Sequence, residues 1–336
     1  MKTLIAGTRK SDLAMWQTRW ATELLKEAVL RHEGNAVDIS LCPIVTRGDK
    51  DLSARLVGKL EKGFFTQELE AALRSGDIDF AVHSLKDLPT RSPEDLCVGA
   101  TLPRAPACDW LVALPSAVDA AASPAQLPLL PRSRVGSSSV RREALLRHFG
   151  NELQTLPLRG NVPTRLEKLL SGNYEAIVVA AAGLLRLKAE LEPFVVFELN
   201  PRRWVSAPGQ GAVAIQCRTA DTALRERLKL ISDAATQEAV ELERAYLREL
   251  EGGCTTPFGC WYDGQWAYLG LQVGEGWRGA QLLPPPRLAG GEWDTAALLP
   301  QLNALSASSS AAASAAASPS PHTESNHELE WLCRQT

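Results

Sequence analysis

The stretch TQELEAALRSGDIDFAVH, residues 66–83, indicates the fold class of this chain. Residues 66–74 predict a helix, Ser75-Gly76-Asp77 predicts its end, and residues 79–83 predict a buried strand. A helix that leads directly into a strand is typical of proteins in which the two elements alternate along the chain. The stretch therefore predicts an α/β fold with parallel sheets.

The same alternation extends in both directions from this stretch. Towards the N-terminus, residues 3–6 predict a strand, Ser11 predicts the start of a helix, and residues 37–45 predict a second strand. Towards the C-terminus a second α/β set follows, with predicted strands at 134–136, 153–158 and 176–180 and predicted helices at 140–149 and 163–170. The chain is therefore expected to form two α/β units.

Changes in composition predict where these units begin and end. Prolines gather between residues 103 and 131, which predicts a crossing into the second unit near residues 103–109, and residues 204–217 predict a return segment. A long helix and a hairpin then predict a small α+β unit, followed by an Ala/Ser-rich linker. The predicted domains are 1–103 together with 204–221, then 104–203, then 222–305, and finally a flexible linker and tail at 306–336.

The composition narrows the class of protein. The 336 residues carry a net charge of −3, which gives no bulk electrostatic attraction to nucleic acid or to an acidic membrane. The seven cysteines are widely spaced without a Cys-x-x-Cys pair, and the five histidines form no cluster with metal-ligand spacing. No signal peptide is recognised, and the longest apolar run, residues 176–185, is too short to cross a bilayer. We expect a cytoplasmic protein without a metal site.

Basic side chains follow the predicted strands at the points where the strands end. In open α/β sheets ligands bind outside the carboxyl ends of the strands, where helix N-termini attract anions. Arginine binds carboxylates in forked pairs, so these residues predict one pocket for a ligand with many carboxylates. Taken singly, each arginine has the alternative of a solvated charge on a helix face. The residues are Arg9, Lys86, Arg141, Arg142, Arg159, Arg165 and Arg186.

Two further residues are candidates for chemistry. Asp87 follows Lys86 beyond a buried strand, where a carboxylate can accept N–H bonds, balance a developing cation or move a proton. The alternative is a local Lys–Asp pair in a turn before Pro89. Cys254 follows two glycines at the end of a predicted helix, and flanking glycines leave a thiol accessible. The alternative is a cysteine buried as a small apolar side chain.

Taken together, these segments closely resemble the porphobilinogen deaminase family, whose members are also called hydroxymethylbilane synthases. Each motif alone is weak, but the set occurs in the family's order from residue 4 to about residue 260. The motifs are TRKS (8–11), VTRGD (45–49), KGFF (62–65), AVHSLKDLP (81–89), GSSSVRR (136–142), LRGNVPT (158–164), PGQGAVA (208–214) and LEGGC (250–254).

The resemblance implies a fold, an activity and a cofactor. The implied fold has two α/β lobes like those of periplasmic binding proteins, crossed twice by the chain, and a small C-terminal α+β domain. The implied enzyme is a cytoplasmic transferase that joins four porphobilinogen units head to tail with loss of ammonia, giving hydroxymethylbilane for tetrapyrrole and haem biosynthesis. A dipyrromethane cofactor would be covalently attached to Cys254. The enzyme would be a monomer that binds porphobilinogen, with neither nucleic acid nor a membrane as a partner.

The resemblance also implies roles for individual residues, and none of them is a metal ligand. Asp87 matches the catalytic carboxylate, which stabilises the cationic azafulvene formed when porphobilinogen loses ammonia. The residues that match cofactor-binding positions are Cys254, Lys86, Ser137, Ser139, Arg141, Arg142 and Arg165. Those that match substrate-binding positions are Arg9, Ser11, Arg159, Arg186 and Gln210.

Two alternatives stay open at the level of the sequence. A two-lobed anion-binding protein without chemistry would have the same lobes, but it would need export and would give no role to residues 252–254. An inactive paralogue is the second alternative. It is suggested by residues 59–63, which replace the family's Gly-Gly-Lys-Gly run, and by residues 105–109, which replace its Asp-Pro-Arg-Asp stretch.

Overall fold

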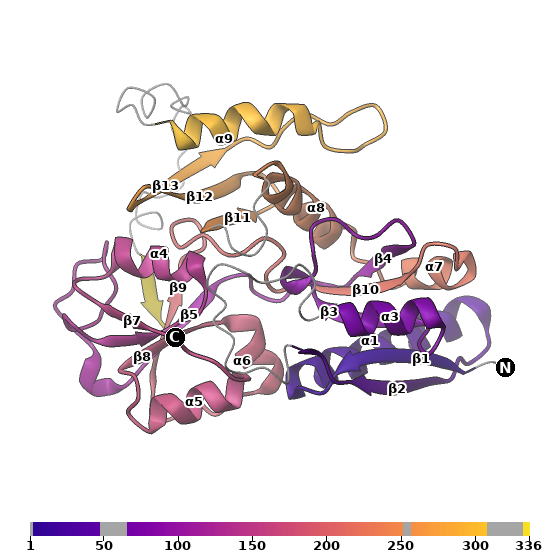
Figure 1. Ribbon diagram of the computed structural model, residues 1–336, viewed down its shortest axis with the longest axis horizontal. Coiled ribbons are helices and arrows are strands. Elements are labelled where there is room, and N and C mark those ends of the chain that lie inside the picture. The colour runs from indigo at the N-terminus through magenta and orange to yellow at the C-terminus, as the bar shows by residue number, and fades with distance from the viewer. Residues whose placement is uncertain (1–2, 48–65, 251–256, 308–331) are drawn as a thin grey trace.

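The computed structural model describes residues 3–47, 66–250, 257–307 and 332–336, which form two α/β lobes and a smaller α+β domain (Figure 1). Two lobes joined by two crossing segments are the architecture that the resemblance predicted, and the structure confirms it. In Figure 1 the lobes lie side by side, and the smaller domain lies above them.

The first lobe is built on a five-stranded sheet with the order β2-β1-β3-β10-β4. β1 is parallel to β2 and β3, whereas β10 runs antiparallel to β3 and β4. Ser11 caps the first helix as predicted, since its Oγ accepts a hydrogen bond from the Ala14 N–H at 3.4 Å. The elements are β1 (Leu4–Arg9), α1 (Asp12–Glu33), β2 (Ile39–Ile44), α3 (Gln67–Ser75), β3 (Phe80–Ser84), the 3-10 turn η1 (Leu85–Asp87), β4 (Leu96–Thr101), β10 (Val213–Arg218) and α7 (Thr222–Lys229).

The second lobe contains a six-stranded sheet with the order β14-β9-β5-β8-β6-β7. Its strands β6, β7 and β8 are parallel, and β5 runs antiparallel to β8 and β9. The strands at 134–136 and 176–180 and the helix at 140–149 begin and end where the sequence predicted. The elements are β5 (Asp109–Ala113), η2 (Pro115–Ala117), β6 (Arg134–Gly136), α4 (Val140–Phe149), β7 (Gln154–Leu156), α5 (Val162–Leu170), β8 (Ala176–Ala180), α6 (Ala181–Leu187), β9 (Val195–Leu199) and β14 (Cys333–Gln335).

The smaller domain packs helices against an antiparallel three-stranded sheet. Tyr246, Cys260, Leu269 and Leu298 are among its buried core residues. The predicted helix and hairpin are present, and a further strand extends the hairpin. The elements are α8 (Ala234–Glu249), β11 (Phe258–Tyr262), β12 (Ala267–Val273), β13 (Gly276–Leu282), η3 (Thr295–Ala297) and α9 (Leu298–Ser306).

The two crossings between the lobes run next to each other. The chain leaves the first lobe after β4 and returns to it before β10. Ala105 N–H donates to the Gly211 carbonyl at 3.1 Å, and Leu102 N–H donates to the Val213 carbonyl at 3.0 Å. A Cβ on Gly211, whose φ is +88°, would lie 2.3 Å from the Ala105 carbonyl oxygen. Glycine at residue 211 therefore permits the close approach of the two crossings.

Packing departs from the predicted domain boundaries at two elements. α7 packs on the first lobe, because Leu224 and Leu228 are buried in the core of that lobe's sheet, so the predicted start of the third domain at residue 222 places this helix in the wrong unit. The last residues, predicted to be part of a flexible tail, form β14 on the edge of the second sheet. Leu332 just before it is fully buried there, and its carbonyl accepts from Asn200 N–H at 2.8 Å. Both contacts join residues that are distant in sequence, which local patterns do not reveal.

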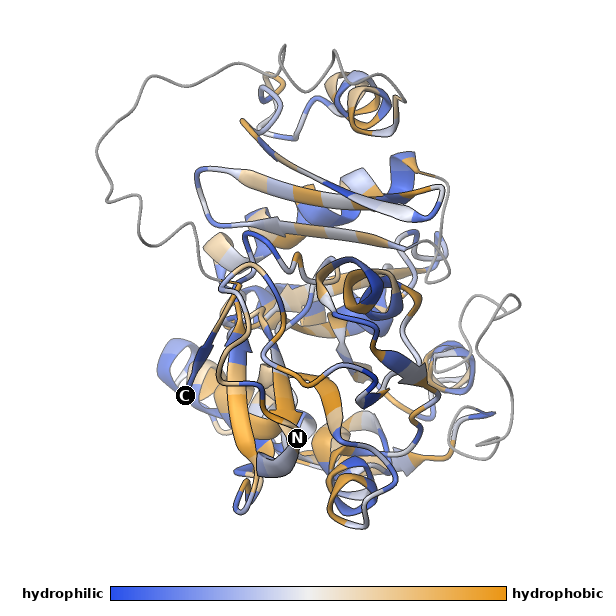
Figure 2. Cartoon of the chain, turned by 90° about the vertical axis from the view of Figure 1, so that its left-hand side faces the viewer, coloured by the Kyte–Doolittle hydropathy of each residue, from blue (hydrophilic) through white to orange (hydrophobic). Residues whose placement is uncertain are grey.

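Apolar residues are concentrated in the strands, and hydrophilic residues lie on the outward helix faces (Figure 2). Each lobe has its own buried core: Phe80 and Ile215 belong to the first, and Leu111 and Val178 belong to the second. Over the part of the chain that the structure describes, no helix combines the length and the apolar character needed to span a membrane.

Candidate active site

A buried carboxylate at the start of β5 organises the basic residues of the second lobe. Asp109 is fully buried and accepts hydrogen bonds from Arg141 at 2.8 Å, from Arg142 at 2.6 and 3.1 Å, from the Trp204 indole at 3.0 Å and from the Gln210 amide at 2.8 Å. Burial alone would raise the pKa of Asp109, but the Arg142 and Arg141 guanidiniums hold that pKa well below its usual range. Asp109 therefore stays ionised and holds both arginines at the start of α4.

The two arginines are buried beside their counter-ion. Arg141 also donates to the Val205 carbonyl at 2.8 Å, and Arg142 donates to the Val178 carbonyl at 3.0 Å. The Arg141 Nε is buried without a hydrogen-bond partner among the described residues. Because buried polar groups normally have partners, this N–H is available to donate to an acceptor that enters the site.

The turn that carries Lys86 and Asp87 is held by the smaller domain. The guanidinium of Arg244, on α8, donates to the carbonyls of Leu85, Leu88 and Pro89 at 3.3, 3.0 and 2.5 Å. Asp87 is exposed, and no residue that the structure describes donates a hydrogen bond to its carboxylate. The turn is therefore fixed in place while the Asp87 carboxylate stays available to a ligand.

Charged groups from both lobes act on one another around this turn. Burial lowers the pKa of Lys86 to about 8, with Asp87 opposing the shift and Arg142 adding to it. Burial lowers the pKa of Arg165 to about 10, and here too Arg142 adds to the shift and Asp87 opposes it. The cluster has more cations than carboxylates: Lys86, Arg141, Arg142 and Arg165 face Asp87 and Asp109. Carboxylates of a ligand would balance the excess positive charge.

The serines before α4 contribute its N-terminal anion site. Ser137 is buried, and its Oγ accepts from Ser139 N–H at 3.2 Å. Ser138 is engaged with the backbone, because its hydroxyl exchanges hydrogen bonds with the Leu158 N–H and carbonyl, both at 3.0 Å. Ser139 is the N-cap of α4 and makes no side-chain cap bond. The Ser139 hydroxyl and the helix N-terminus thus face the position where an anion is favoured.

Arg9, Ser11 and Arg159 lie at the same edges of the two sheets. Arg9 ends β1, which pairs with β3, and it is near enough to His83 to contribute to the lowering of that group's pKa to about 4, which burial dominates. Arg159 is half-buried between β7 and α5 and contributes to the lowered pKa of Arg165. The structure therefore brings Arg159 into the cluster and places Arg9 beside the strand that leads to Asp87.

Arg186 and Gln210 lie at the crossings, where protein groups occupy much of their hydrogen-bonding capacity. Arg186 donates to the Gly211 carbonyl at 2.6 Å, and its guanidinium lies 5.9 and 6.0 Å from the ring centroids of Trp16 and Trp20. The Gln210 amide donates to the Ala107 carbonyl at 2.6 Å as well as to Asp109. Their observed contacts tie the lobes together, and their predicted contact with substrate stays a prediction.

Two buried carboxylates important to the site were missed by the sequence analysis. Asp109 opens the apolar strand β5 directly after the crossing, and a charge at the head of such a strand is the signal that was present. Glu243 is fully buried on α8 and forms a forked pair with Arg104 at 2.7 and 3.0 Å, while Gly209 N–H donates to it at 2.7 Å. The corresponding signal was the spacing: Glu243 follows Ala239 by four residues, which places both side chains on the same, inner face of α8. The Arg104–Glu243 pair joins the smaller domain to the crossings.

Cys254 and residues 59–63 lie outside the described residues. The predicted attachment of a cofactor to the Cys254 sulfur therefore stays a prediction from the sequence, as does any effect of the altered loop sequence.

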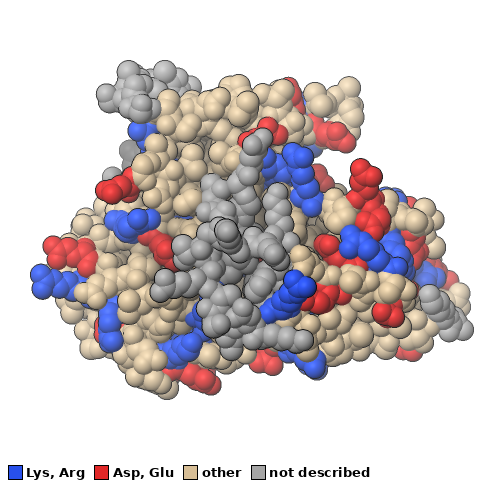
Figure 3. All heavy atoms as spheres, viewed as in Figure 1, with Lys and Arg blue, Asp and Glu red and all other residues tan. Residues whose placement is uncertain are grey.

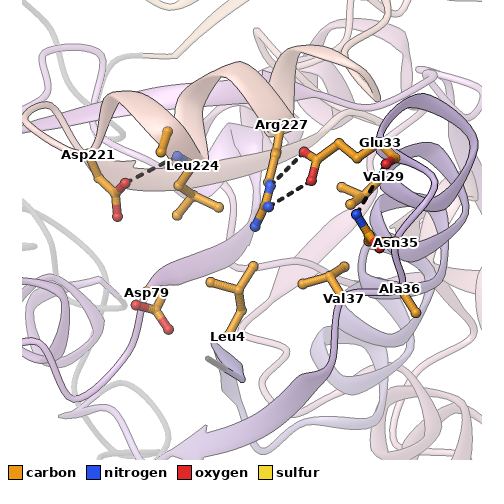
Figure 4. A pocket seen from close by; sticks show the side chains of 11 residues that line it. Leu4, Val29, Glu33, Asn35, Ala36, Val37, Asp79, Asp221, Leu224 and Arg227 are labelled. Atoms are coloured by element: carbon orange, nitrogen blue, oxygen red, sulfur yellow. Dashed lines mark hydrogen bonds and ion pairs between the residues drawn. The ribbon is translucent and has the colours of Figure 1, made fainter. Parts of the chain in front are cut away.

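A hollow of about 530 Å³ lies at the other end of the first sheet (Figure 4). It is lined by Leu4 and Val37 and bordered by a forked pair in which Arg227 donates to Glu33 at 2.7 and 2.8 Å. Leu4 begins β1, whereas Arg9 ends it, so the hollow is at the amino end of the strand and the charged cluster is at the carboxyl end. The carboxyl end is where open α/β sheets bind ligands.

On the face shown in Figure 3, the visible acidic and basic side chains are interspersed. Within the described residues, no group of three or more His, Cys, Asp or Glu side chains is arranged to hold a metal ion.

Comparisons with known proteins agree with this geometry. Residues 4–226 match the family described as "Porphobilinogen deaminase, dipyromethane cofactor binding domain". The porphobilinogen deaminase of Stenotrophomonas maltophilia (strain R551-3) is 43% identical over 258 residues, which cover 76% of this chain and 80% of the relative. That of Moorella thermoacetica is 43% identical over 252 residues, covering 75% of this chain and 76% of the relative.

Among solved structures, the chain is similar to a periplasmic substrate-binding protein of an ABC transporter from Coxiella burnetii. The TM-score is 0.40 and the identity 11%, with 70% of this chain and 94% of that chain covered. The assignment rests on the sequence matches, which extend over most of the chain and of its relatives. By these matches the chain belongs to the porphobilinogen deaminase family.

Proposed function

We propose that Asp87 is the catalytic carboxylate of this chain and that the basic cluster binds the carboxylate arms of cofactor and substrate. As a member of its family, the chain is a transferase of tetrapyrrole biosynthesis with hydroxymethylbilane synthase activity and a dipyrromethane cofactor. The reaction joins four porphobilinogen units with loss of ammonia. The assignment of residues to the steps is our proposal.

The described residues fit a dipyrromethane. Its pyrrole rings carry acetate and propionate arms, and the cluster has an excess of positive charge together with the unpartnered Arg141 N–H. When bound, the cofactor supplies the terminal pyrrole ring to which substrate is joined. We assign its attachment to the Cys254 sulfur. We assign its carboxylates to Lys86, Ser137, Ser139, Arg141, Arg142 and Arg165.

Porphobilinogen also carries carboxylate arms, and residues at the same sheet edges suit them. We assign these arms to Arg9, Ser11 and Arg159, because Arg9 and Arg159 are half-buried at the edge that faces the cluster. Arg186 and Gln210 also belong to the proposed substrate site. Their contacts at the crossings suggest that they act by holding the lobes in register.

A single observation supports Asp87 most strongly. Of the two carboxylates in the cluster, Asp109 already accepts from four side chains, whereas Asp87 accepts from none of the described residues. Asp109 thus has little capacity left for a ligand, and Asp87 can accept pyrrole N–H groups. Arg244 fixes the turn beneath Asp87, so the carboxylate is positioned before substrate binds.

This position suits both demands of the chemistry. Departure of ammonia builds positive charge on the porphobilinogen ring, and the Asp87 carboxylate balances that charge. Formation of the carbon–carbon bond would release a proton from the nucleophilic pyrrole carbon, and an Asp87 carboxylate oxygen would accept that proton.

The test compares Asp87→Asn with Asp87→Glu in single-turnover kinetics on cofactor-loaded protein. Loss of one well-placed electrostatic stabiliser costs on the order of a hundredfold to a thousandfold in rate, so we expect that loss in the Asn variant. The Glu variant keeps the charge and should retain measurable turnover. Asp77→Asn, at an exposed aspartate before β3, is the matched control. If Asp87→Asn forms the bond at the wild-type rate, Asp87 is only a turn residue.

We also propose that the enzyme acts as a monomer in the cytoplasm. The described groups of the proposed site come from both lobes of a single chain, which supports a monomer. Sedimentation of the cofactor-loaded enzyme at working concentration tests whether it is a monomer, and a stable dimer would contradict the proposal.

A further inference from the structure

Two thiols face each other within the first sheet, away from the site. Cys97 of β4 and Cys217 of β10 are direct partners in an antiparallel pair, and their Sγ atoms are 3.9 Å apart. Opposed residues in such a pair have Cα atoms about 4.5–5.5 Å apart. That spacing lies within the range of about 4.4–6.8 Å that disulfides require. The strand pairing is therefore compatible with a bridge between these two side chains.

The surroundings of the two sulfurs differ. Cys217 is fully buried, whereas Cys97 is half-buried. A Cβ on Gly99 would lie 2.7 Å from Leu228 Cδ1 and 3.0 Å from the Cys217 sulfur, so glycine at this position permits both side chains to pack closely against β4. The pairing of β4 with β10 also shifts register next to Gly99. An incoming reagent therefore reaches Cys97 first, and the buried Cys217 sulfur lies 3.9 Å from the Cys97 sulfur.

We propose that Cys97 and Cys217 form a redox modification site that a low-molecular-weight disulfide oxidises to an intramolecular disulfide. The Cys97 thiolate attacks one sulfur of the oxidant, forms a mixed disulfide and expels one thiolate. The Cys217 thiolate then attacks the Cys97 sulfur, forms the Cys97–Cys217 bond and expels the second thiolate. The two expelled thiolates take up the two protons lost by the cysteines. Two protein thiols are oxidised, and the oxidant is reduced to two thiols.

The reaction should be slow at neutral pH and faster at higher pH. Burial raises the pKa of the Cys217 thiol to about 12, with Cys97 adding to the shift and Arg225 opposing it. Because the thiolate is the reactive form, raising the pH increases the rate of the resolving step.

The bridge would join the two strands that lead into and out of the second lobe. β4 precedes the first crossing and β10 follows the return crossing. Cys217 pairs with Phe80 at the start of β3, whereas Val213, at the other end of β10, pairs with Ser84 near the Lys86 turn. The bond would therefore stabilise the first lobe at the end of the sheet away from Asp87. We expect higher stability with unchanged turnover.

The experiment treats cofactor-loaded, full-length enzyme with oxidised glutathione and follows it by intact mass, peptide mapping and thermal unfolding. The expected product is lighter by the mass of two hydrogen atoms and yields a linked peptide containing Cys97 and Cys217. Closing a loop of this length should raise the unfolding midpoint by about 5–10 °C without reducing agent, and reductant should reverse the rise.

Two variants separate this site from other thiols. Cys97→Ser should abolish both the linked peptide and the shift, while Cys42→Ser, at a half-buried cysteine of the same sheet, should preserve both. Because Cys97 is half-buried, its serine variant is expected to fold. The peptide map of the oxidised wild-type enzyme tests the proposal even if the variant does not fold. A stable glutathione adduct on Cys97 without a link to Cys217 would overturn the proposal, as would a linked peptide that forms only after denaturation.

Discussion

Replacing Asp109 by asparagine tests whether the buried carboxylate holds the site together. Asn has nearly the same shape, but it removes the charge shared by Arg141 and Arg142 and places an N–H₂ group where donors now converge. The two guanidiniums would remain buried without their counter-ion. The variant should therefore lose stability and, with it, the geometry of the basic cluster.

The magnitude follows from the contacts. Asp109 accepts five hydrogen bonds, two of them from Arg142. Hydrogen bonds to charged groups contribute about 1.5–3 kcal/mol each, but bonds in one network do not add. Removal of one partner from a buried ion pair typically costs about 3–5 kcal/mol. At about 2–4 °C per kcal/mol for a unit of 150–250 residues, the unfolding midpoint should fall by about 6–20 °C.

The assay combines thermal unfolding with cofactor content measured by mass. The matched control is Asp95→Asn, which removes a carboxylate that accepts from Arg74 Nε at 2.7 Å at the surface, with both side chains about half exposed (43% and 53%). An exposed pair contributes about 1 kcal/mol or less, so the control should shift the midpoint by no more than about 4 °C.

The pH dependence provides a second signature. The arginines hold the pKa of Asp109 below that of the unfolded chain, about 3.9. Its contribution to stability is therefore fully present above pH 4 and is lost as the pH falls towards the folded pKa. The difference between wild type and Asp109→Asn should persist from pH 8 to 5. Our reasoning is refuted if Asp109→Asn loses no more stability than Asp95→Asn and retains full cofactor content.

Four further outcomes can be measured. Because Lys86 loses its charge as the pH rises through about 8, assembly of the cofactor on unloaded enzyme, measured by intact mass, should weaken there, and Lys86→Met should flatten that profile. Arg244→Met should lower kcat by about a hundredfold through misplacement of the turn, and Arg244→Lys should restore part of the loss. His83 is buried and its pKa is lowered to about 4. Between about pH 6.5 and 4 the imidazole is therefore protonated in the unfolded chain but not in the folded one, and the free energy of unfolding falls as the pH drops through this range. His83→Gln should remove that component from urea unfolding curves. Acid-denatured enzyme should exceed its sequence mass by two pyrrole units, and Cys254→Ser should lack the excess.

Local patterns were sufficient where each element is determined by its own residues. The strand at 176–180 is a continuous apolar run, and the helix at 140–149 begins beyond three serines, so their bounds in the structure are the predicted ones. The position of Lys86 and Asp87 was also predictable, because a side chain just past a buried strand lies at the carboxyl edge of the sheet. Cys254 was predicted from motif order, and the described residues do not test it.

Counter-ions and long-range packing were not predictable in the same way. α7 follows the return strand in sequence, and only the burial of Leu224 and Leu228 shows that it belongs to the first lobe. The end of the chain looked like a tail until β14 paired with β9. Asp109 and Glu243 were overlooked because a charge in an apolar segment gives no indication of which distant arginine neutralises it.

The sequence alone thus determined the alternation of strands and helices, the double crossing and the set of basic residues, because each depends on local hydropathy, turn residues or motif order. Only the tertiary structure decided which carboxylate is saturated and which is available. Asp109 and Asp87 are the same residue type near the ends of strands in the same cluster, but three side chains from one lobe and an amide from the crossing converge on Asp109. A hydrogen bond between residues about 100 positions apart depends on how the lobes pack, which no local pattern contains.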